Sequence, residues 1–202
     1  IPDIVTTGLH TVAVRMPKNA SALALIKEAG TPIAAPSANS FGYPSPTRVE
    51  HVIEDLSGKI DLILSGGVAQ IGIESTVLDL TCSPPVILRP GGVSRESLAR
   101  TLGKVFISSE DEAGPLKSPG QMKQHYAPRA KVLLFGGKRR EKVIQTMRER
   151  MAELKEGNRI GIMIPEEELV HFTDTEGIVL GLGSFATMEQ VARELFATMR
   201  AL

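Results

Sequence analysis

Apolar and polar positions in the first half of the chain alternate in a pattern that predicts short strands separated by helices. Runs rich in β-branched residues mark the strands, and polar N-cap residues followed by apolar residues at helical spacing mark the helices. The predicted strands are 10–15, 31–35, 61–64, 74–80 and 85–89, and the predicted helices are 20–29, 47–56 and 94–102. Strands with helices between them predict an α/β or α+β unit.

Three short polar residues are the predicted N-caps of these helices. Asn19 and Ser94 each precede a helical run, and Thr47 with Glu50 three residues later matches a capping box. Thr187 and Gln190 repeat the capping-box spacing before the last predicted helix.

The second half alternates between strand and helix patterns more regularly. Strands are predicted at 131–135, 159–164 and 178–182, with helices at 138–156 and from Thr187 onward. The apolar residues predicted to face the core are Val143, Met147, Met151 and Leu154 of the first helix and Val191, Leu195 and Met199 of the second. Alternating strands and helices predict a parallel sheet in a small doubly wound domain.

Residues 108–130 differ in character from both halves. The later part of this stretch holds three prolines and two glycines, which disfavour regular structure. At roughly 20 residues it is longer than most connections inside a compact domain, which is typical of a linker or a functional loop. The predicted organisation is therefore a first domain at 1–107, a linker loop at 108–130 and a second domain at 131–202.

Composition narrows the function classes. Lys and Arg number 23, and Asp and Glu also number 23, so the zero net charge argues against a protein that coats nucleic acid. Cys82 is the single cysteine, which excludes an internal disulfide and suits a reducing compartment. The sequence has neither a signal peptide pattern nor an apolar run long enough to cross a bilayer, so we expect a cytoplasmic protein.

Several polar or charged side chains lie at the predicted ends of strands and helices, where ligands often bind. Ser37 and Asn39 follow a predicted strand, Thr47 begins a predicted helix whose N–H groups could receive phosphate, and Arg15 and Arg89 each end a predicted strand. Each has a plainer explanation as a turn residue, a helix cap or a solvated cation. The tight turn in LRPGG would fix the direction of Arg89, which favours a functional role there.

The sequence gives little support for a metal site, a P-loop or a Ser-His-Asp site. The four histidines, His10, His51, His125 and His171, lack the spacing of metal ligands, so no metal site is predicted. The glycine turns at 65–67 and 72–76 allow close approach of a ligand, but neither is a P-loop. A Ser-His-Asp arrangement is not readable from the residue order.

Six motifs in a fixed order make the sequence resemble a known family. They are HTVAVRMP, PIAAPSAN, GYPSPT, GIESTVLDL, ILRPGG and SPGQMKQHYAP. Together they resemble the two-domain threonylcarbamoyl-AMP synthases, in which a YrdC-type α/β domain precedes a C-terminal extension. The specific motifs cover residues 1–128, and beyond Lys131 the resemblance rests on the layout of a small Rossmann-like parallel-sheet domain.

The resemblance implies a nucleotidyltransferase, an L-threonylcarbamoyladenylate synthase. Such an enzyme uses ATP, L-threonine and bicarbonate with a divalent cation, usually Mg²⁺, and releases pyrophosphate. A downstream transferase then moves the threonylcarbamoyl group to tRNA. The implied reaction needs positioning and charge neutralisation rather than a covalent nucleophile, which agrees with the absence of a recognisable one.

The resemblance also implies site residues by matching motif. Threonine is expected to contact Arg15, Ser37 and Ser75, and ATP to contact Thr11, Asn39, Thr47, Arg89 and Tyr126, with Thr76 as a neighbouring candidate. His125 and Tyr126 would close the linker loop over the nucleotide and exclude water. Lys117 and Lys123 could add positive charge there, although solvated loop lysines are the plainer interpretation.

One departure from the family pattern concerns the start of the chain. The family has a basic Lys-x-Arg-type stretch that holds the triphosphate, and these 202 residues do not contain it. Because the chain opens on Ile1 rather than Met, we expect the YrdC-type domain to be truncated and this stretch to lie upstream. A chain beginning at Ile1 is then expected to bind nucleotide weakly and to be inactive alone.

Three alternatives stay open at this point. The carbamoyltransferase of hydrogenase maturation shares the YrdC-type domain, but it should show zinc-finger cysteines. A non-catalytic module that binds tRNA or other RNA is a second possibility, for which the neutral charge and two tyrosines, Tyr43 and Tyr126, offer little. The third is an α/β scaffold whose turn motifs are incidental.

Overall fold

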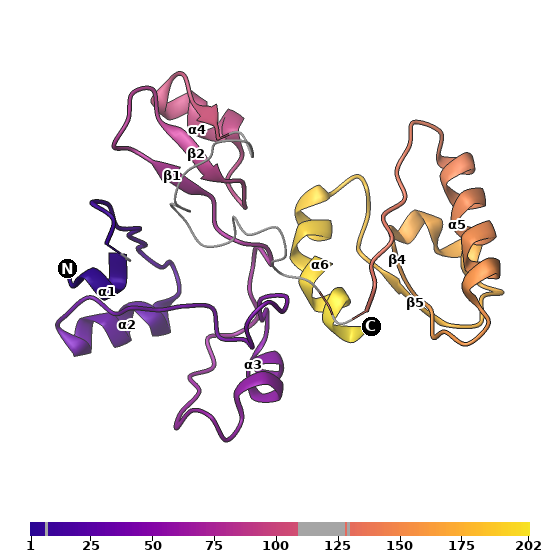
Figure 1. Ribbon diagram of the computed structural model, residues 1–202, viewed down its shortest axis with the longest axis horizontal. Helices are drawn as coiled ribbons and strands as arrows, with labels where there is room; N and C mark the ends of the chain where they lie inside the picture. Colours follow the sequence, from indigo (N-terminus) through magenta and orange to yellow (C-terminus); the bar gives the residue numbers. More distant parts are fainter. Residues whose placement is uncertain (7, 109–127, 129) are drawn as a thin grey trace. The chain divides into compact units, whose positions relative to one another are not determined.

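The chain forms two compact units in the computed structural model, Ile1–Ala127 and Pro128–Leu202 (Figure 1). The structure describes residues 1–6, 8–108, 128 and 130–202. Most of the predicted linker, 109–127 and 129, lies outside the described residues, so the three predicted segments stay a prediction. Both units combine helices with strands, and each contains a parallel strand pair, which confirms the predicted α/β class.

The described part of the first unit contains four helices: α1 (Asp3–Thr6), α2 (Ala20–Ala29), α3 (Val49–Leu56) and α4 (Arg95–Leu102). Two of the predicted caps are confirmed. Asn19 Oδ1 accepts the Ala22 N–H at 3.1 Å, and Ser94 Oγ accepts the Ser97 N–H at 3.1 Å.

Both predicted capping boxes are wrong. The N-cap of α3 is Arg48, so Thr47 lies one residue before the cap position and its hydroxyl does not cap the helix. Its main-chain N–H instead donates to Nδ1 of His51 at 3.2 Å. Thr187 is the N-cap of α6, but its side chain makes no capping bond, because a main-chain turn from Gln190 N–H to Thr187 O takes that place.

The sheet of the first unit has three short strands in the order β1-β2-β3. These are β1 (Val77–Asp79), β2 (Val86–Arg89) and β3 (Phe106–Ile107). β1 and β2 pair antiparallel, with Val77 opposite Arg89, while β2 and β3 pair parallel. Ile87 of β2 is 2% exposed and forms part of the core. The predicted strands at 74–80 and 85–89 are therefore confirmed at their centres, and β3 was not predicted.

Four other predicted strands are wrong. The segments 10–15, 31–35, 61–64 and 131–135 are not assigned as strands. A strand is defined by its ladder of hydrogen bonds to a neighbour, and the described residues offer these segments no partner strand. Their apolar side chains are accordingly exposed in part, as for Ile33 in the segment that was predicted to be buried.

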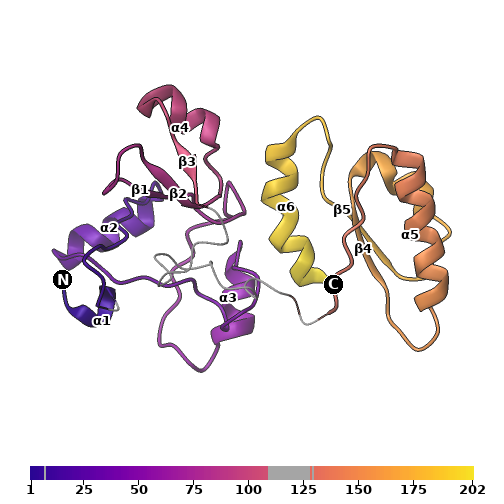
Figure 2. The same cartoon turned by 45° about the horizontal axis from the view of Figure 1, so that its top comes forward.

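The second unit is a two-stranded parallel sheet with a helix on either side (Figure 2). Its elements are α5 (Arg140–Leu154), β4 (Gly161–Ile164), the 3-10 helix η1 (Glu166–Phe172), β5 (Ile178–Gly181) and α6 (Met188–Ala201). β4 and β5 run in register from Gly161 opposite Ile178 to Ile164 opposite Gly181. The predicted parallel sheet is thus present, although 131–135 does not join it.

Packing of the second unit centres on Ile162, Ile164 and Phe172, each at most 4% exposed. Met147 and Met151 of α5 pack against this core, as the helical spacing predicted. On α6 the fully buried residues are Phe196, Ala197 and Thr198, whereas the predicted Val191, Leu195 and Met199 are half-buried. Consecutive residues of a helix point to different sides, so the burial of α6 extends beyond the predicted apolar face.

Ion pairs connect α5 to the segment between β4 and β5. Arg148 donates to both carboxylate oxygens of Asp174, at 2.9 and 2.6 Å. These hydrogen bonds lower the pKa of the Asp174 carboxyl below its ordinary value. In the same way, Lys155 lowers the pKa of Glu176 through a hydrogen bond. None of the described helices is long and apolar enough to cross a membrane.

Candidate functional site

Three of the sequence motifs converge in the first unit around the main chain of Glu74, Ser75 and Thr76. A Cβ atom added to Gly91 would lie 2.3 Å from Glu74 O and 2.4 Å from Thr76 N, so only glycine permits this approach of two backbones. The Gly92 N–H donates to Glu74 O at 3.0 Å. The LRPGG turn is therefore packed directly on the GIEST segment.

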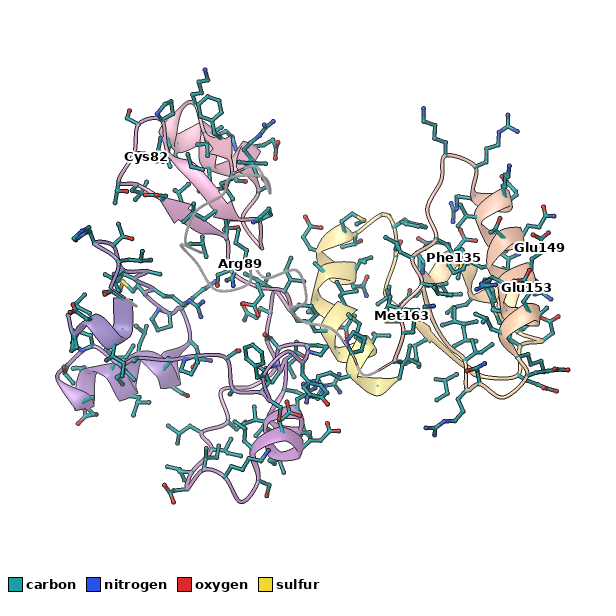
Figure 3. All side chains as sticks on the ribbon, in the orientation of Figure 1. Cys82, Arg89, Phe135, Glu149, Glu153 and Met163 are labelled. Atoms are coloured by element: carbon teal, nitrogen blue, oxygen red, sulfur yellow. The ribbon has the colours of Figure 1, made fainter. Side chains whose placement is uncertain are left out.

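Arg89 is the charged centre of this arrangement (labelled in Figure 3). Because Arg89 pairs with Val77 across the β1–β2 ladder, its side chain begins next to the residues that precede β1. Nε and Nη2 of Arg89 donate to Ser75 O at 3.2 and 2.9 Å, and Nη2 lies 3.4 Å from Glu74 Oε2. The residue is only 9% exposed, and a buried guanidinium requires such partners.

Ser45 adds the third motif, GYPSPT, to the cluster. Its hydroxyl donates to Glu74 Oε1, so the Glu74 carboxylate contacts the proline-rich loop with one oxygen and faces Arg89 with the other. We call Ser45, Glu74, Ser75 and Arg89 the Arg89 cluster. Sequence reasoning identified Ser75 and Arg89 but missed Ser45 and Glu74, although both lie within motifs that were recognised.

Two predicted ATP contacts, Thr47 and Asn39, have buried side-chain oxygens with no hydrogen-bond partner among the described residues. Thr47 is 5% exposed, and its main-chain carbonyl accepts the Ala69 N–H at 2.8 Å, which fixes the backbone while Oγ1 stays unpaired. Asn39 donates from Nδ2 to the carbonyls of Ser40 and Tyr43, at 2.9 and 3.1 Å, and leaves Oδ1 unpaired. An unpaired buried oxygen calls for an explanation, and a bound ligand is one.

Among the described residues, several other predicted contacts lie outside the Arg89 cluster. Thr11, Arg15 and Ser37 lie on exposed coil, and no hydrogen bond or ion pair connects them to it in the part of the chain that is described. Thr76 uses its hydroxyl locally, since Oγ1 donates to Val93 O at 2.7 Å and accepts the Val93 N–H. Tyr126 lies outside the described residues.

The charged side chains of the cluster are one guanidinium and one carboxylate, which pair with each other. Within residues 1–6, 8–108, 128 and 130–202, no group of three or more His, Cys, Asp and Glu side chains could hold a metal ion. The Glu74 carboxylate is already engaged by Ser45 and Arg89. A guanidinium held in one plane is a side chain that suits a phosphate or carboxylate ligand.

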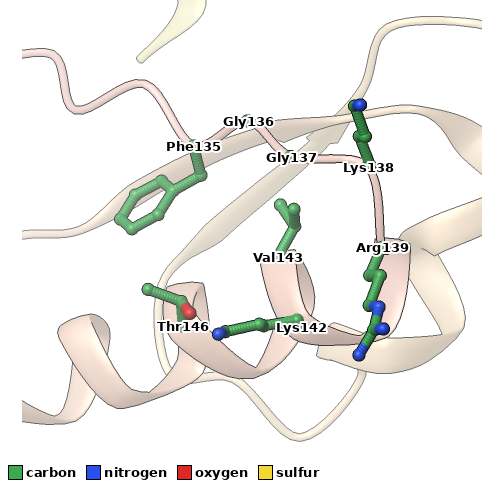
Figure 4. A pocket seen from close by; sticks show the side chains of 8 residues that line it. All are labelled: Phe135, Gly136, Gly137, Lys138, Arg139, Lys142, Val143 and Thr146. Carbon is green, nitrogen blue, oxygen red and sulfur yellow. The ribbon is translucent and has the colours of Figure 1, made fainter.

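A separate cavity of about 240 Å³ lies in the second unit at the start of α5 (Figure 4). Phe135 lies at one end and Lys138 and Arg139 at the other, with Val143 between them. Its walls are Phe135, Gly136, Gly137, Lys138, Arg139, Lys142, Val143 and Thr146. The residues that line it were not predicted as contacts of ATP or threonine.

The two units define an α/β protein whose first unit brings three sequence motifs together around a largely buried arginine. Two family models match successive parts of the chain. A family model described as "Telomere recombination" matches residues 1–91, and one described as "Threonylcarbamoyl-AMP synthase, C-terminal domain" matches residues 93–202. The chain belongs to the threonylcarbamoyl-AMP synthase family.

Individual relatives cover nearly all of this chain. The threonylcarbamoyl-AMP synthase of Pyrococcus abyssi is 42% identical over 99% of the chain, and that of Bacillus subtilis is 42% identical over 98%. The crystal structure of P. abyssi Sua5 complexed with L-threonine superposes on 100% of the chain with a TM-score of 0.88 and 42% identity. The chain spans 57%, 56% and 58% of the lengths of these three relatives.

Proposed function

We propose that the protein is an L-threonylcarbamoyladenylate synthase. It makes threonylcarbamoyl-AMP and pyrophosphate from ATP, L-threonine and bicarbonate, and the product serves threonylcarbamoyladenosine modification of tRNA. The observation that carries this proposal is the 42% identity, over 99% of the chain, to a protein named threonylcarbamoyl-AMP synthase. The crystal structure of P. abyssi Sua5 complexed with L-threonine supports the amino-acid substrate.

The proposed ATP site contains Thr11, Asn39, Thr47, Arg89 and Tyr126, and the proposed threonine site contains Arg15, Ser37 and Ser75. Mg²⁺ would accompany the triphosphate and be held mainly by its oxygens, because Mg²⁺ commonly binds through substrate phosphates. The first domain would hold both substrates, the linker loop with Tyr126 would cover the nucleotide, and the C-terminal domain would support the loop. A downstream transferase in the cytoplasm would accept the product.

The proposed reaction needs no covalent bond to the enzyme. Threonine and bicarbonate give a carbamate with loss of water, and a carbamate oxygen then attacks the α-phosphorus of ATP. The new carbamate–phosphorus bond replaces the bond to the β-phosphate, and pyrophosphate leaves. Arg89 would neutralise charge on the phosphates, and the hydroxyl of Thr47 would donate to a phosphate oxygen, which are contributions of electrostatic stabilisation and positioning.

The testing experiment is pyrophosphate release from ATP by the full-length protein, with threonine and bicarbonate each present or omitted. We expect release only when both are present. Arg89→Ala and Asn39→Ala should abolish it. Arg95→Ala is the matched control, because Arg95 is an exposed arginine on α4 whose partner is Glu96, and it should keep full activity.

Two outcomes would contradict the proposed function. Release that requires neither threonine nor bicarbonate would show a different ATP-consuming reaction. Absence of release together with tight, salt-sensitive binding of tRNA would indicate the non-catalytic RNA-binding module instead.

A further inference from the structure

Glu74 is the member of the Arg89 cluster to which neither the motifs nor the expected ATP contacts assign a role. It is held at three points. Its main-chain carbonyl accepts the Gly92 N–H at 3.0 Å, its Oε1 accepts the Ser45 hydroxyl, and its Oε2 lies 3.4 Å from Nη2 of Arg89. Its side chain is 20% exposed, so this carboxylate is directed at its neighbours rather than at solvent.

The charge of Glu74 argues against direct contact with a phosphate. A carboxylate beside an anion site lowers the positive potential there and repels a phosphate ligand. We therefore look for its role in its effect on the orientation of the Arg89 side chain. A free arginine side chain has many rotamers, and an anchored guanidinium loses less entropy when it binds a ligand.

The geometry of the contacts fits such an anchor. Ser75 O accepts from both Nε and Nη2 of Arg89, which fixes the plane of the guanidinium along one edge. Glu74 Oε2 lies 3.4 Å from Nη2, the nitrogen that also donates to Ser75 O. The charged partner thus reinforces the carbonyl at a nitrogen that is already held.

Ser45 gives the carboxylate a rigid support. It lies between Pro44 and Pro46, whose rings fix their φ angles, and Pro44 is among the residues buried most completely. The same loop continues to Thr47, whose buried Oγ1 is a proposed ATP contact. The Ser45–Glu74 contact therefore joins the loop that carries Thr47 to the strand end that carries Arg89.

We propose that Glu74 is a positioning residue for Arg89, and that Ser45 holds Glu74 in place; the role rests on the proposed contact of Arg89 with ATP. Glu74 sets the orientation of the guanidinium before the nucleotide binds, and it keeps Arg89 and the Thr47 loop at a fixed separation. Its effect on catalysis is transmitted through Arg89 and not by contact with substrate.

The test is Glu74→Gln in the full-length protein, with the dissociation constant of ATP measured by calorimetry and KM and kcat measured by pyrophosphate release. Gln keeps the shape of the side chain and can still accept the Ser45 hydrogen bond, but it loses the charge. We expect about tenfold weaker ATP binding and a similar rise in KM for ATP, from loss of one charge-assisted contact, with kcat and KM for threonine changed less than about twofold. Glu96→Gln, at an exposed glutamate paired with Arg95, is the matched control and should change neither.

Two further comparisons separate positioning from a structural role. In an Arg89→Lys background Glu74→Gln should weaken ATP binding by no more than about twofold, because Lys cannot make the fork contact with Ser75 O that Glu74 reinforces. Ser45→Ala should weaken ATP binding in the wild-type background and have no further effect in Glu74→Gln. A lowered thermal midpoint with unchanged ATP affinity in Glu74→Gln and Ser45→Ala would overturn the positioning role.

The same measurements distinguish failure of the proposed synthase function from failure of the positioning role of Glu74. If the wild-type protein binds ATP but releases no pyrophosphate, the synthase activity fails while the ATP affinities still decide the role of Glu74. If the wild-type protein does not bind ATP, the contact of Arg89 with ATP is wrong, and the positioning role is overturned with it.

Discussion

Two buried side-chain oxygens of the first unit bear on the proposed ligand contacts. Thr47 Oγ1 and Asn39 Oδ1 are buried and lack hydrogen-bond partners among the described residues. Leaving a buried acceptor unpaired costs about 1–3 kcal/mol, so the unliganded protein is less stable than an apolar variant of equal shape would be. A ligand that pairs with these oxygens recovers that free energy on binding. The unpaired oxygens would therefore favour binding of the ligand.

Thr47→Val tests this link, because valine has the shape of threonine without the hydroxyl. We expect the unliganded protein to be as stable as the wild type or more stable by about 1 kcal/mol, since the unpaired oxygen is removed. ATP binding should weaken by about tenfold, because the hydroxyl no longer donates to the nucleotide. Chemical unfolding and calorimetric titration with ATP measure the two effects.

The control for this prediction is Thr101→Val, at an exposed threonine of α4, which should leave ATP affinity unchanged. Loss of stability in Thr47→Val with unaltered ATP binding would show that the Thr47 hydroxyl is structural and that the proposed contact is wrong.

The residues of the Arg89 cluster differ in how far the sequence reveals them. Arg89 could be predicted because LRPGG shows a strand end followed by a tight turn. Glu74 and Ser45 could not, because the hydrogen bond between them spans 29 residues and depends on how the proline-rich loop folds back. Thr11, Arg15 and Ser37 were assigned by resemblance, and their roles stay predictions.

Helices and strands show the same contrast between local and distant causes. The caps at Asn19 and Ser94 act within one turn, so their positions in the sequence predicted where α2 and α4 begin. A strand forms only when a partner supplies the other half of the ladder, and this partner is not visible in a local pattern. The unpaired segments 10–15, 31–35, 61–64 and 131–135 show this limit.

Contacts between elements in the first unit depend on the absence of a side chain at Gly91. Gly91→Ala would place a Cβ 2.3 Å from Glu74 O, so the LRPGG turn or the GIEST segment must shift. We expect a loss of about 1–3 kcal/mol of unfolding free energy, as for overpacked sites, together with weaker ATP binding because Arg89 moves. The urea midpoint and ATP titration measure these changes.

Gly136→Ala is the matched control, because a Cβ at Gly136 meets no atom within 4 Å. It should change stability by less than about 0.5 kcal/mol. A Gly91→Ala protein with wild-type stability and ATP affinity would contradict the close packing of the two backbones.

The whole molecule contains two units with cores of their own, centred on Ile87 and Val105 in the first and on Ile162, Ile164 and Phe172 in the second. They differ in the kind of electrostatic contact they contain. In the second unit the ion pairs of Asp174 and Glu176 lie at the surface, and hydrogen bonds lower the pKa of both carboxyls. In the first unit the charged cluster around Arg89 is largely enclosed.

Acid should therefore weaken the second unit through Asp174. A carboxyl whose folded pKa is lowered contributes stability that is complete above its unfolded pKa, about 4 for aspartate, and is lost as the pH falls through the folded value. We expect Asp174→Asn to lower the urea midpoint at pH 7 and to match the wild type near pH 2, where both lack the charge.

The control is Glu156→Gln, an exposed glutamate of the second unit whose carboxylate has no ion pair within the described ranges. Its urea midpoint should follow the wild type at every pH. Equal midpoints for Asp174→Asn and the wild type at pH 7 would show that the Arg148–Asp174 pair does not contribute to folding.

The anchoring of Arg89 by a main-chain carbonyl has a consequence for the evolution of substrate choice. Every residue type at position 75 supplies the same carbonyl oxygen, so the arginine keeps its fork contact whatever side chain position 75 carries. Under the proposed function the side chain at this position faces the amino acid. Selectivity for the amino acid can thus diverge at position 75, by mutation or by design, while the nucleotide half of the site is inherited intact.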